Sequence, residues 1–156
     1  MNGLPKRKLN RLDNYDYTQK GAYFVTICSM DNKYLFGSIK DGVMMLNDIG
    51  VIVEKELMNI STHFDNVEVN NYTVMPNHVH LIIAIILTGA ESDARSITIG
   101  NIVRGYKSGV SRLIGYSPWQ RNYHDHIIRN QEDYNRIAEY VDSNPARWAG
   151  DRYNAG

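Results

Sequence analysis

The sequence feature that most constrains the fold is a pair of extended segments separated by a proline. Residues 67–74 alternate between apolar and polar side chains, Pro76 and Asn77 interrupt the alternation, and residues 78–87 continue as an apolar run that begins with two histidines. Alternation is typical of a strand with one buried face, and a short apolar run is typical of a buried strand. The two segments therefore predict an antiparallel strand pair within a sheet.

The two histidines, His78 and His80, flank a single valine at the start of the second strand. Successive side chains of a strand point to opposite faces, so both imidazoles lie on one face, roughly 7 Å apart along the strand. A pair placed in this way can hold one cation. Histidine in a strand is also commonly a half-buried structural residue, and the spacing by itself leaves both interpretations open.

The rest of the chain alternates between strand and helix patterns. We expect a strand at 22–30, a hairpin with an Asp-Gly turn at 34–46, helices at 48 to about 64, 97–114 and 131–143, a loop at 88–96 and a short extended segment at 119–129. This order predicts an α+β fold of ferredoxin-like (RRM-like) type, with helices packed on one face of an antiparallel sheet. At 156 residues the chain fits a single domain, 1–156, of which residues 1–15 form a basic N-terminal arm.

Composition excludes several classes of protein. Hydrophobic residues make up 43% and charged residues 22% of the chain, as in ordinary soluble proteins. The single cysteine, Cys28, cannot form an internal disulfide and is expected in the core. The first dozen residues do not resemble a signal peptide, and the apolar run at 81–87 is too short to cross a bilayer. We therefore expect a cytoplasmic protein with no membrane partner.

The net charge is zero, but the charges are sorted along the chain. Basic residues without intervening acids are Lys6, Arg7, Lys8 and Arg11 near the N-terminus, and Arg95, Arg104, Lys107 and Arg112 later on. Acidic residues instead concentrate between positions 41 and 68. One face of the protein could then be basic and the opposite face acidic, and clustered cations bind a phosphate backbone by releasing counterions. An ordinary solvated helix face explains these charges equally well.

A second group of polar residues lies on the last expected helix. Residues four apart share a helix face, so Arg136, Tyr140 and Asn144 form one stripe, whereas Tyr134 lies with the core residues Ile137 and Val141. A tyrosine and an amide oxygen near a histidine-bound cation are the groups needed for nucleophilic attack on a phosphodiester. A tyrosine packed at the sheet edge with its hydroxyl in water is the alternative.

Several motifs in this order resemble a known family. They are Met75-Pro76-Asn77-His78-Val79-His80, the opening segment 16–26, Leu35-Phe36-Gly37, Trp119-Gln120 with Tyr123, His126 and Arg129, and the segment Tyr140 to Pro145. Over nearly its whole length the chain resembles the single-tyrosine transposases of the HUH nuclease superfamily, and more closely the REP-associated tyrosine transposases. Histidine-hydrophobe-histidine is the HUH motif.

The resemblance implies a set of roles for these residues. Tyr140 would be the nucleophile, His78 and His80 would bind Mg²⁺ or Mn²⁺, and Asn144 would be the third ligand, at a position where many relatives carry glutamine or glutamate. His126 and Asp125 are lower-ranked substitutes for that third ligand. The product would be a 5′-phosphotyrosine and a free 3′-hydroxyl, with no nucleotide cofactor, which agrees with the absence of a glycine-rich phosphate loop that contains a lysine.

The implied substrate is single-stranded DNA with a hairpin near the cleavage site. The candidate DNA-binding residues are Lys6, Arg7, Lys8, Arg11, Arg104, Lys107, Arg112 and Arg136. Trp119 or Tyr123 could stack on an unpaired base, although a core position is the better expectation for Trp119. Flexible segments at 88–96 and 143–145 leave open whether Tyr140 serves its own subunit or a partner in a homodimer.

Two other functions remain open from the sequence. A ferredoxin-like sheet is also a platform for single-stranded nucleic acid, so the protein could be a binding module with structural histidines. It could also be a related HUH nickase of the replication-initiator or relaxase type, although such enzymes normally carry further domains.

Overall fold

The computed structural model describes residues 19–86, 97–151 and 153–154. Its elements in chain order are β1 (Gln19–Cys28), η1 (Met30–Asn32), β2 (Gly37–Lys40), β3 (Val43–Leu46), α3 (Asp48–Met58), α4 (Ile60–His63), β4 (Val67–Met75), β5 (His78–Ile86), α6 (Ile99–Ile114), β6 (His124–Ile127), α7 (Gln131–Ser143) and η2 (Pro145–Gly150). The basic arm and the loop expected at 88–96 lie outside the described residues.

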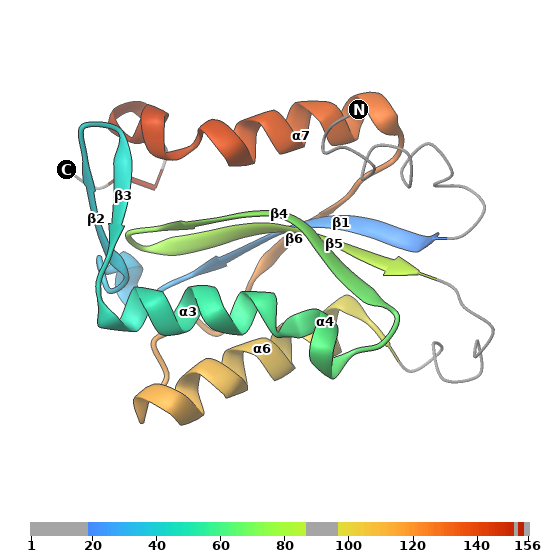
Figure 1. Ribbon diagram of the computed structural model, residues 1–156, viewed down its shortest axis with the longest axis horizontal. Helices are drawn as coiled ribbons and strands as arrows, with labels where there is room; N and C mark the ends of the chain where they lie inside the picture. Colours follow the sequence, from blue (N-terminus) through green and yellow to red (C-terminus); the bar gives the residue numbers. More distant parts are fainter. Residues whose placement is uncertain (1–18, 87–96, 152, 155–156) are drawn as a thin grey trace.

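The main sheet has the strand order β4-β5-β1-β6, and every neighbouring pair is antiparallel (Figure 1). Helix α3 lies in sequence between β1 and β4, and α6 lies between β5 and β6. This is the βαββαβ arrangement of a ferredoxin-like fold, so the expected α+β class is confirmed. The strand pair predicted around Pro76 is the β4–β5 hairpin.

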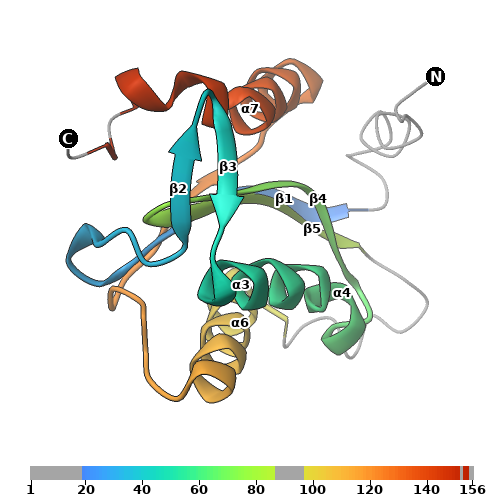
Figure 2. The same ribbon diagram turned by 60° about the vertical axis from the view of Figure 1, so that its left-hand side comes forward.

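Local sequence explains where the helices begin and how the small hairpin turns. The side chains of Asn47, Thr98 and Asn130 accept hydrogen bonds from backbone N–H groups in the first turns of α3, α6 and α7. Between β2 and β3, Asp41 and Gly42 both have positive φ, as the two central residues of a type I′ hairpin turn require. Figure 2 shows this hairpin reaching from α3 toward the C-terminal turn η2.

The helices cover both faces of the sheet, which corrects the expectation that they pack on one face. On β5, Val79, Leu81 and Ile83 belong to the core beneath α3 and α6, whereas Ile82 belongs to a second core with α7 (Figure 1). The physical reason is that β5 is apolar on both faces and α7 has an apolar stripe of its own. That stripe consists of Tyr134, Ile137 and Val141.

The charges are also arranged differently from the expectation of a basic face opposite an acidic one. Helix α3, which carries Glu54 and Glu56, packs beside the basic helix α6 on the same side of the sheet (Figure 2). The buried Tyr106 hydroxyl on α6 donates a hydrogen bond of 2.9 Å to the carbonyl oxygen of Val53 on α3. The two helices lie together because their apolar stripes are buried against the same core.

None of the helices in the described part of the chain combines the length and the apolar character that a membrane crossing requires.

Candidate active site

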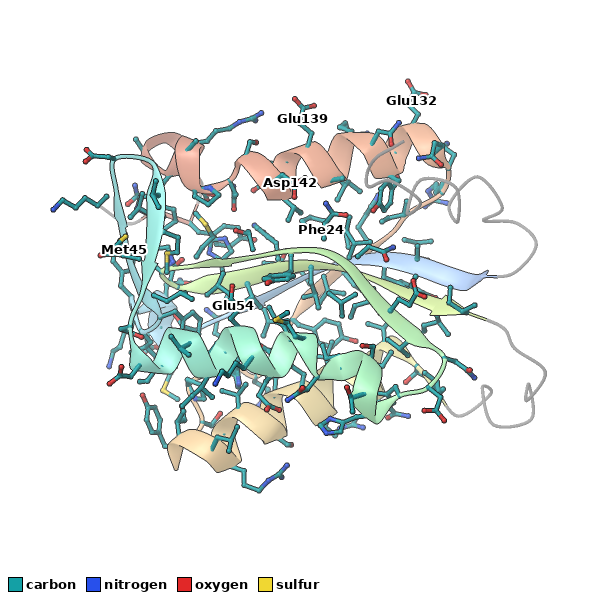
Figure 3. The ribbon with its side chains drawn as sticks, viewed as in Figure 1. Phe24, Met45, Glu54, Glu132, Glu139 and Asp142 are labelled. Atoms are coloured by element: carbon teal, nitrogen blue, oxygen red, sulfur yellow. The ribbon has the colours of Figure 1, made fainter. Side chains whose placement is uncertain are left out.

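A cavity of about 450 Å³ opens between the sheet and α7. Its floor consists of Phe24 and Thr26 on β1, His80 on β5, and His124 and His126 on the edge strand β6. The strand register explains this set, because Thr26 pairs with both His80 and His124, and Phe24 pairs with His126. Figure 3 shows Phe24 between the sheet and α7, while Glu132 and Glu139 of α7 point away from the sheet. Asp125, Tyr140 and Tyr153 complete the lining.

The two histidines of β5 are buried on this face with their rings in contact. The Nε2 atoms of His78 and His80 are 3.1 Å apart. Nδ1 of His78 lies 2.8 Å from the side-chain oxygen of Asn77, whose amide nitrogen donates to the backbone carbonyls of Asn32 and Tyr153. That oxygen can only accept, so His78 carries its proton on Nδ1. Its Nε2 lone pair therefore faces His80.

The second imidazole has a different neighbour. Nδ1 of His80 lies 2.9 Å from the hydroxyl of Thr26. A hydroxyl can donate or accept, so Thr26 permits either tautomer of His80. Because Nε2 of His78 carries no proton, Nε2 of His80 donates in the contact between the two Nε2 atoms. If the proton of His80 were on Nδ1 instead, Thr26 would accept it, and both Nε2 lone pairs could hold one cation.

Burial keeps His78 uncharged. It lowers the pKa of His78 to about 4, while the negative charge of Asp151 and a side-chain contact with Asn144 oppose the shift. His78 is therefore neutral at pH 7, and a neutral imidazole is the form that binds a metal ion.

Asn144 lies at the C-terminal end of α7 and is 1% exposed. Its Nδ2 donates to a carboxylate oxygen of Asp151 at 3.0 Å. Its Oδ1 is buried and, among the described residues, has no partner that meets hydrogen-bond geometry, although the side chain lies close enough to His78 to raise the pKa of that imidazole. A buried oxygen of this kind beside the neutral imidazole of His78 is suited to bind a cation, because a buried acceptor without a donor is costly unless something binds it.

These three residues fit a divalent cation. If two ligand atoms each lie about 2.1 Å from one ion and their bonds to it meet at a right angle, the two atoms are about 3.0 Å apart. The separation of the two Nε2 atoms, 3.1 Å, is close to this value. No group of three or more His, Cys, Asp or Glu side chains forms a metal site among the residues that the structure describes. The groups that could hold a cation at this position are two imidazoles and one amide, those of His78, His80 and Asn144.

Tyr140 lies one helical turn before Asn144 and lines the cavity that opens between the sheet and α7. Its ring centroid is 5.3 Å from that of His80 and 6.2 Å from that of Phe24. Tyr134 instead is buried in the second core, where its hydroxyl donates to the side-chain oxygen of Asn71 at 2.7 Å. The structure thus brings together Tyr140, Asn144 and both histidines.

The sequence reasoning missed the segment that closes one end of the site. The ring of Tyr153 lies 4.3 Å from the ring of His78, and Trp148 stacks on His78 at 6.3 Å, measured between ring centroids. Asp151 binds Asn144. The aromatic residues after Pro145 were visible in the sequence, but no periodic pattern connects this short irregular segment to a strand more than 65 residues earlier.

His126 and Asp125, the lower-ranked candidates for the third metal ligand, do not lie free beside the histidine pair. Nε2 of His126 bonds to the carboxylate of Asp133 at 3.0 Å, and Asp133 also accepts from the guanidinium of Arg136 and the backbone N–H of Arg129. Burial raises the pKa of Asp133, but these hydrogen bonds and positive charges lower it by more, so it is ionised at pH 7. Asp125 lines the cavity but is exposed.

The expected DNA-binding residues fall into separate groups. Arg136 is exposed and lines a shallow cavity with Tyr140 and Arg147. Arg104 and Lys107 line a groove of about 560 Å³ beside α6, together with Arg121 and Tyr123. Arg112 is exposed at the end of α6. Lys6, Arg7, Lys8 and Arg11 lie outside the described residues.

Lys107 and Trp119, two of the residues expected to contact DNA, already contact other parts of the protein. The ammonium group of Lys107 donates to the backbone carbonyls of Gln120 and Arg121 at 2.8 and 3.1 Å, and partial burial lowers its pKa. Trp119 is 4% exposed and packs against Phe36 and Tyr106, so it is a core residue.

Comparison with solved structures identifies the fold. The structure aligns with that of a REP-associated tyrosine transposase bound to a REP hairpin, with a TM-score of 0.63, 20% identity, and 86% of this chain and 72% of the other covered. It also aligns with a candidate transposase from Deinococcus radiodurans, with a TM-score of 0.51, 16% identity, and coverage of 81% and 90%. The protein therefore has the fold of these transposases.

Comparison of sequences gives the family. The chain is 37% identical over 169 residues to an uncharacterized protein of Haemophilus influenzae, covering 96% of this chain and 94% of that protein. The chain belongs to the same family as this Haemophilus protein. No protein-family model matches it.

Proposed function

We propose that the protein is a single-tyrosine DNA transposase or endonuclease that cleaves and rejoins single-stranded DNA beside a hairpin. The observation that carries this proposal is the convergence of Tyr140, His78, His80 and Asn144 on one side of the sheet, although they come from two elements about 60 residues apart in sequence. The transposase fold supports it, as does the DNA hairpin bound by the aligned REP-associated transposase.

In the proposed reaction the phenol oxygen of Tyr140 attacks a backbone phosphorus. A tyrosine–phosphorus bond forms, the bond from phosphorus to the 3′ oxygen breaks, and the products are a 5′-phosphotyrosine and a 3′-hydroxyl. The proton lost by the phenol balances the proton gained by the 3′ oxygen. Because the ester is conserved, a 3′-hydroxyl can later attack the phosphotyrosine and rejoin a strand, and no nucleotide cofactor is consumed.

A tyrosine with an ordinary pKa near 10 is a weak nucleophile at pH 7, so the site has to make the phosphate more reactive. A bound Mg²⁺ or Mn²⁺ supplies Lewis-acid polarisation of the scissile phosphate. His78, His80 and Asn144 would hold this ion, and the ring contact of Tyr140 with His80 would keep the nucleophile beside it. Phe24, packed edge-on against Tyr140, limits where the phenol ring can lie.

The edge strand β6 supports a path for single-stranded DNA. Arg121 and Tyr123 line the groove beside α6, and His124, Asp125 and His126, which follow directly, line the cavity that contains His80 and Tyr140. One short segment therefore connects a groove that contains two arginines and an aromatic ring to the site of cleavage. Arginines suit the phosphates, and the Tyr123 ring suits an unpaired base.

The test is to trap the covalent product. Full-length protein is incubated with labelled hairpin-containing oligonucleotides and Mn²⁺, and the mixture is denatured and separated by size. We expect a labelled protein band that chelator abolishes, and peptide mapping should place the phosphate on Tyr140. A phosphate on Tyr153, which lines the same cavity, would change the nucleophile but keep the enzyme class. Binding without any adduct would support a nucleic-acid-binding module and contradict the proposal.

A further inference from the structure

We infer that Asp151 is a positioning residue that orients the Asn144 amide with its oxygen toward the histidine pair. This inference rests on the metal site of the proposed function. The Nδ2 atom of Asn144 lies 3.0 Å from one carboxylate oxygen of Asp151. The opposite end of the same amide, Oδ1, is buried with no partner in hydrogen-bond geometry among the described residues, and the side chain contacts His78.

The orientation matters because the two ends of an amide have nearly the same shape and opposite chemistry. Only the oxygen can bind a cation, and the nitrogen end would present hydrogens to it. A carboxylate accepts hydrogen bonds and cannot donate them. Asp151 therefore selects the rotamer of Asn144 in which the nitrogen faces the carboxylate and the oxygen faces away from it.

Asp151 is itself held in place by the chain around it. Its second carboxylate oxygen accepts from the backbone N–H of Tyr153 at 2.8 Å, and its own N–H donates to the carbonyl of Trp148 at 3.0 Å. Both carboxylate oxygens thus face donors. An asparagine at position 151 has only one acceptor oxygen for these two donors, so its NH₂ group would meet either the Tyr153 N–H or the Asn144 amide nitrogen.

The negative charge of Asp151 is the competing explanation for any effect on metal binding. The carboxylate lies close enough to His78 to raise its pKa, so it could also attract a cation without orienting anything. Orientation of the amide and attraction by charge predict different results when residue 144 has a carboxylate side chain, as in Asn144→Asp. A carboxylate has two equivalent oxygens and cannot present the wrong end, so it needs no orienting partner.

The experiment is a double-mutant cycle read by Mn²⁺ titration of the metal-free protein in a calorimeter. Asp151→Asn should weaken Mn²⁺ binding about tenfold or more when residue 144 is asparagine. In the Asn144→Asp background the same substitution should cause no loss, because the NH₂ of an asparagine at 151 can donate to one carboxylate oxygen and leave the other for Mn²⁺. Tyr34→Phe is the matched control, since it removes a hydrogen bond from Tyr34 to Asn154 in the same C-terminal segment without touching Asn144.

An equal loss in both backgrounds would assign the effect to the charge of Asp151 and overturn the inference, as would no loss in either. A loss in Tyr34→Phe as large as that in Asp151→Asn would trace the effect to the C-terminal segment in general and overturn it too. If the wild-type protein does not bind Mn²⁺, the metal site of the proposed function fails and the inference fails with it. If the wild-type protein binds Mn²⁺ and Asp151→Asn binds it equally well, only the inference about Asp151 is contradicted, and the proposed metal site stands.

Discussion

The hydroxyl of Thr26 on β1 lies 2.9 Å from Nδ1 of His80 on the neighbouring strand β5. The two residues are direct partners in the strand register, so backbone pairing fixes this contact. Because a hydroxyl both donates and accepts, Thr26 can satisfy His80 with or without a ligand on its Nε2 atom. When one ring nitrogen of a histidine binds a metal, the hydrogen-bond partner of the other ring nitrogen commonly changes the metal affinity.

The first prediction is that Thr26→Val weakens Mn²⁺ binding about tenfold, whereas Thr26→Ser keeps it near the wild-type value. Valine has the shape of threonine but removes the hydrogen bond to Nδ1 of the buried His80. Calorimetric titration measures the affinity, and thermal unfolding checks that both variants fold. Wild-type affinity in Thr26→Val would show that the hydroxyl does not support the ligand.

The second prediction concerns the histidine pair. His78→Ala or His80→Ala should abolish strand cleavage, with DNA affinity changed by less than about threefold, because contacts to phosphates supply most of the affinity. His63→Ala, an exposed histidine on α4, is the control. Cleavage at the wild-type rate in a variant with both His78→Ala and His80→Ala would contradict the proposed metal site. Loss of binding together with cleavage would point to a structural role for the pair.

The third prediction concerns the nucleophile. Tyr140→Phe should stop cleavage and adduct formation while the fold and Mn²⁺ binding survive, since only one oxygen is removed. Tyr134→Phe should retain both activities, although it loses the hydrogen bond to Asn71 and about 1 kcal/mol of stability. Adduct formation is followed on denaturing gels and stability by urea unfolding. An adduct that persists in Tyr140→Phe refutes the assignment.

The fourth prediction concerns the salt dependence of DNA binding. Affinity for a hairpin oligonucleotide should fall steeply with salt, and replacing Arg104 and Arg121 by alanine should reduce the log-log slope by about two, one for each phosphate that is no longer neutralised. Replacing Lys6, Arg7 and Lys8 together should reduce it by about three. Fluorescence anisotropy at several salt concentrations gives the slopes. An unchanged slope in one variant would show that its substituted residues do not bind DNA phosphates.

The fifth prediction concerns stability and pH. Burial lowers the pKa of His78 from 6.5 to about 4, so between these values the unfolded chain binds a proton that the folded protein excludes. The metal-free protein should therefore lose up to about 3 kcal/mol of unfolding free energy as the pH falls from 6.5 to 4. The lowered pKa of Asp133 acts at more acidic pH, so its contribution is separate.

Urea unfolding at pH 7, 6 and 5 with chelator measures this loss. His78→Gln should show a smaller decline over the same range because it has no imidazole to protonate, and His63→Ala should follow the wild type. An equal decline in His78→Gln and the wild type would mean that another group causes it.

The sequence alone determined the local parts of this protein. The strands and the helices followed from periodicities of two and 3.6 residues, and so did the shared face of His78 and His80 and the separation of Tyr140 from Tyr134. These features depend on neighbours a few residues away, which is why the order of residues along the chain could predict them.

Only the tertiary structure decided how these parts meet. Periodicity shows that α7 has an apolar stripe, but the choice of sheet face depends on packing against Ala22 and Ile82, which are far away in the chain. That choice places Tyr140 and Asn144 over the histidines. The approach of Asp151 and Tyr153 to His78 likewise joins residues that are 65 or more positions apart, and no local pattern encodes it.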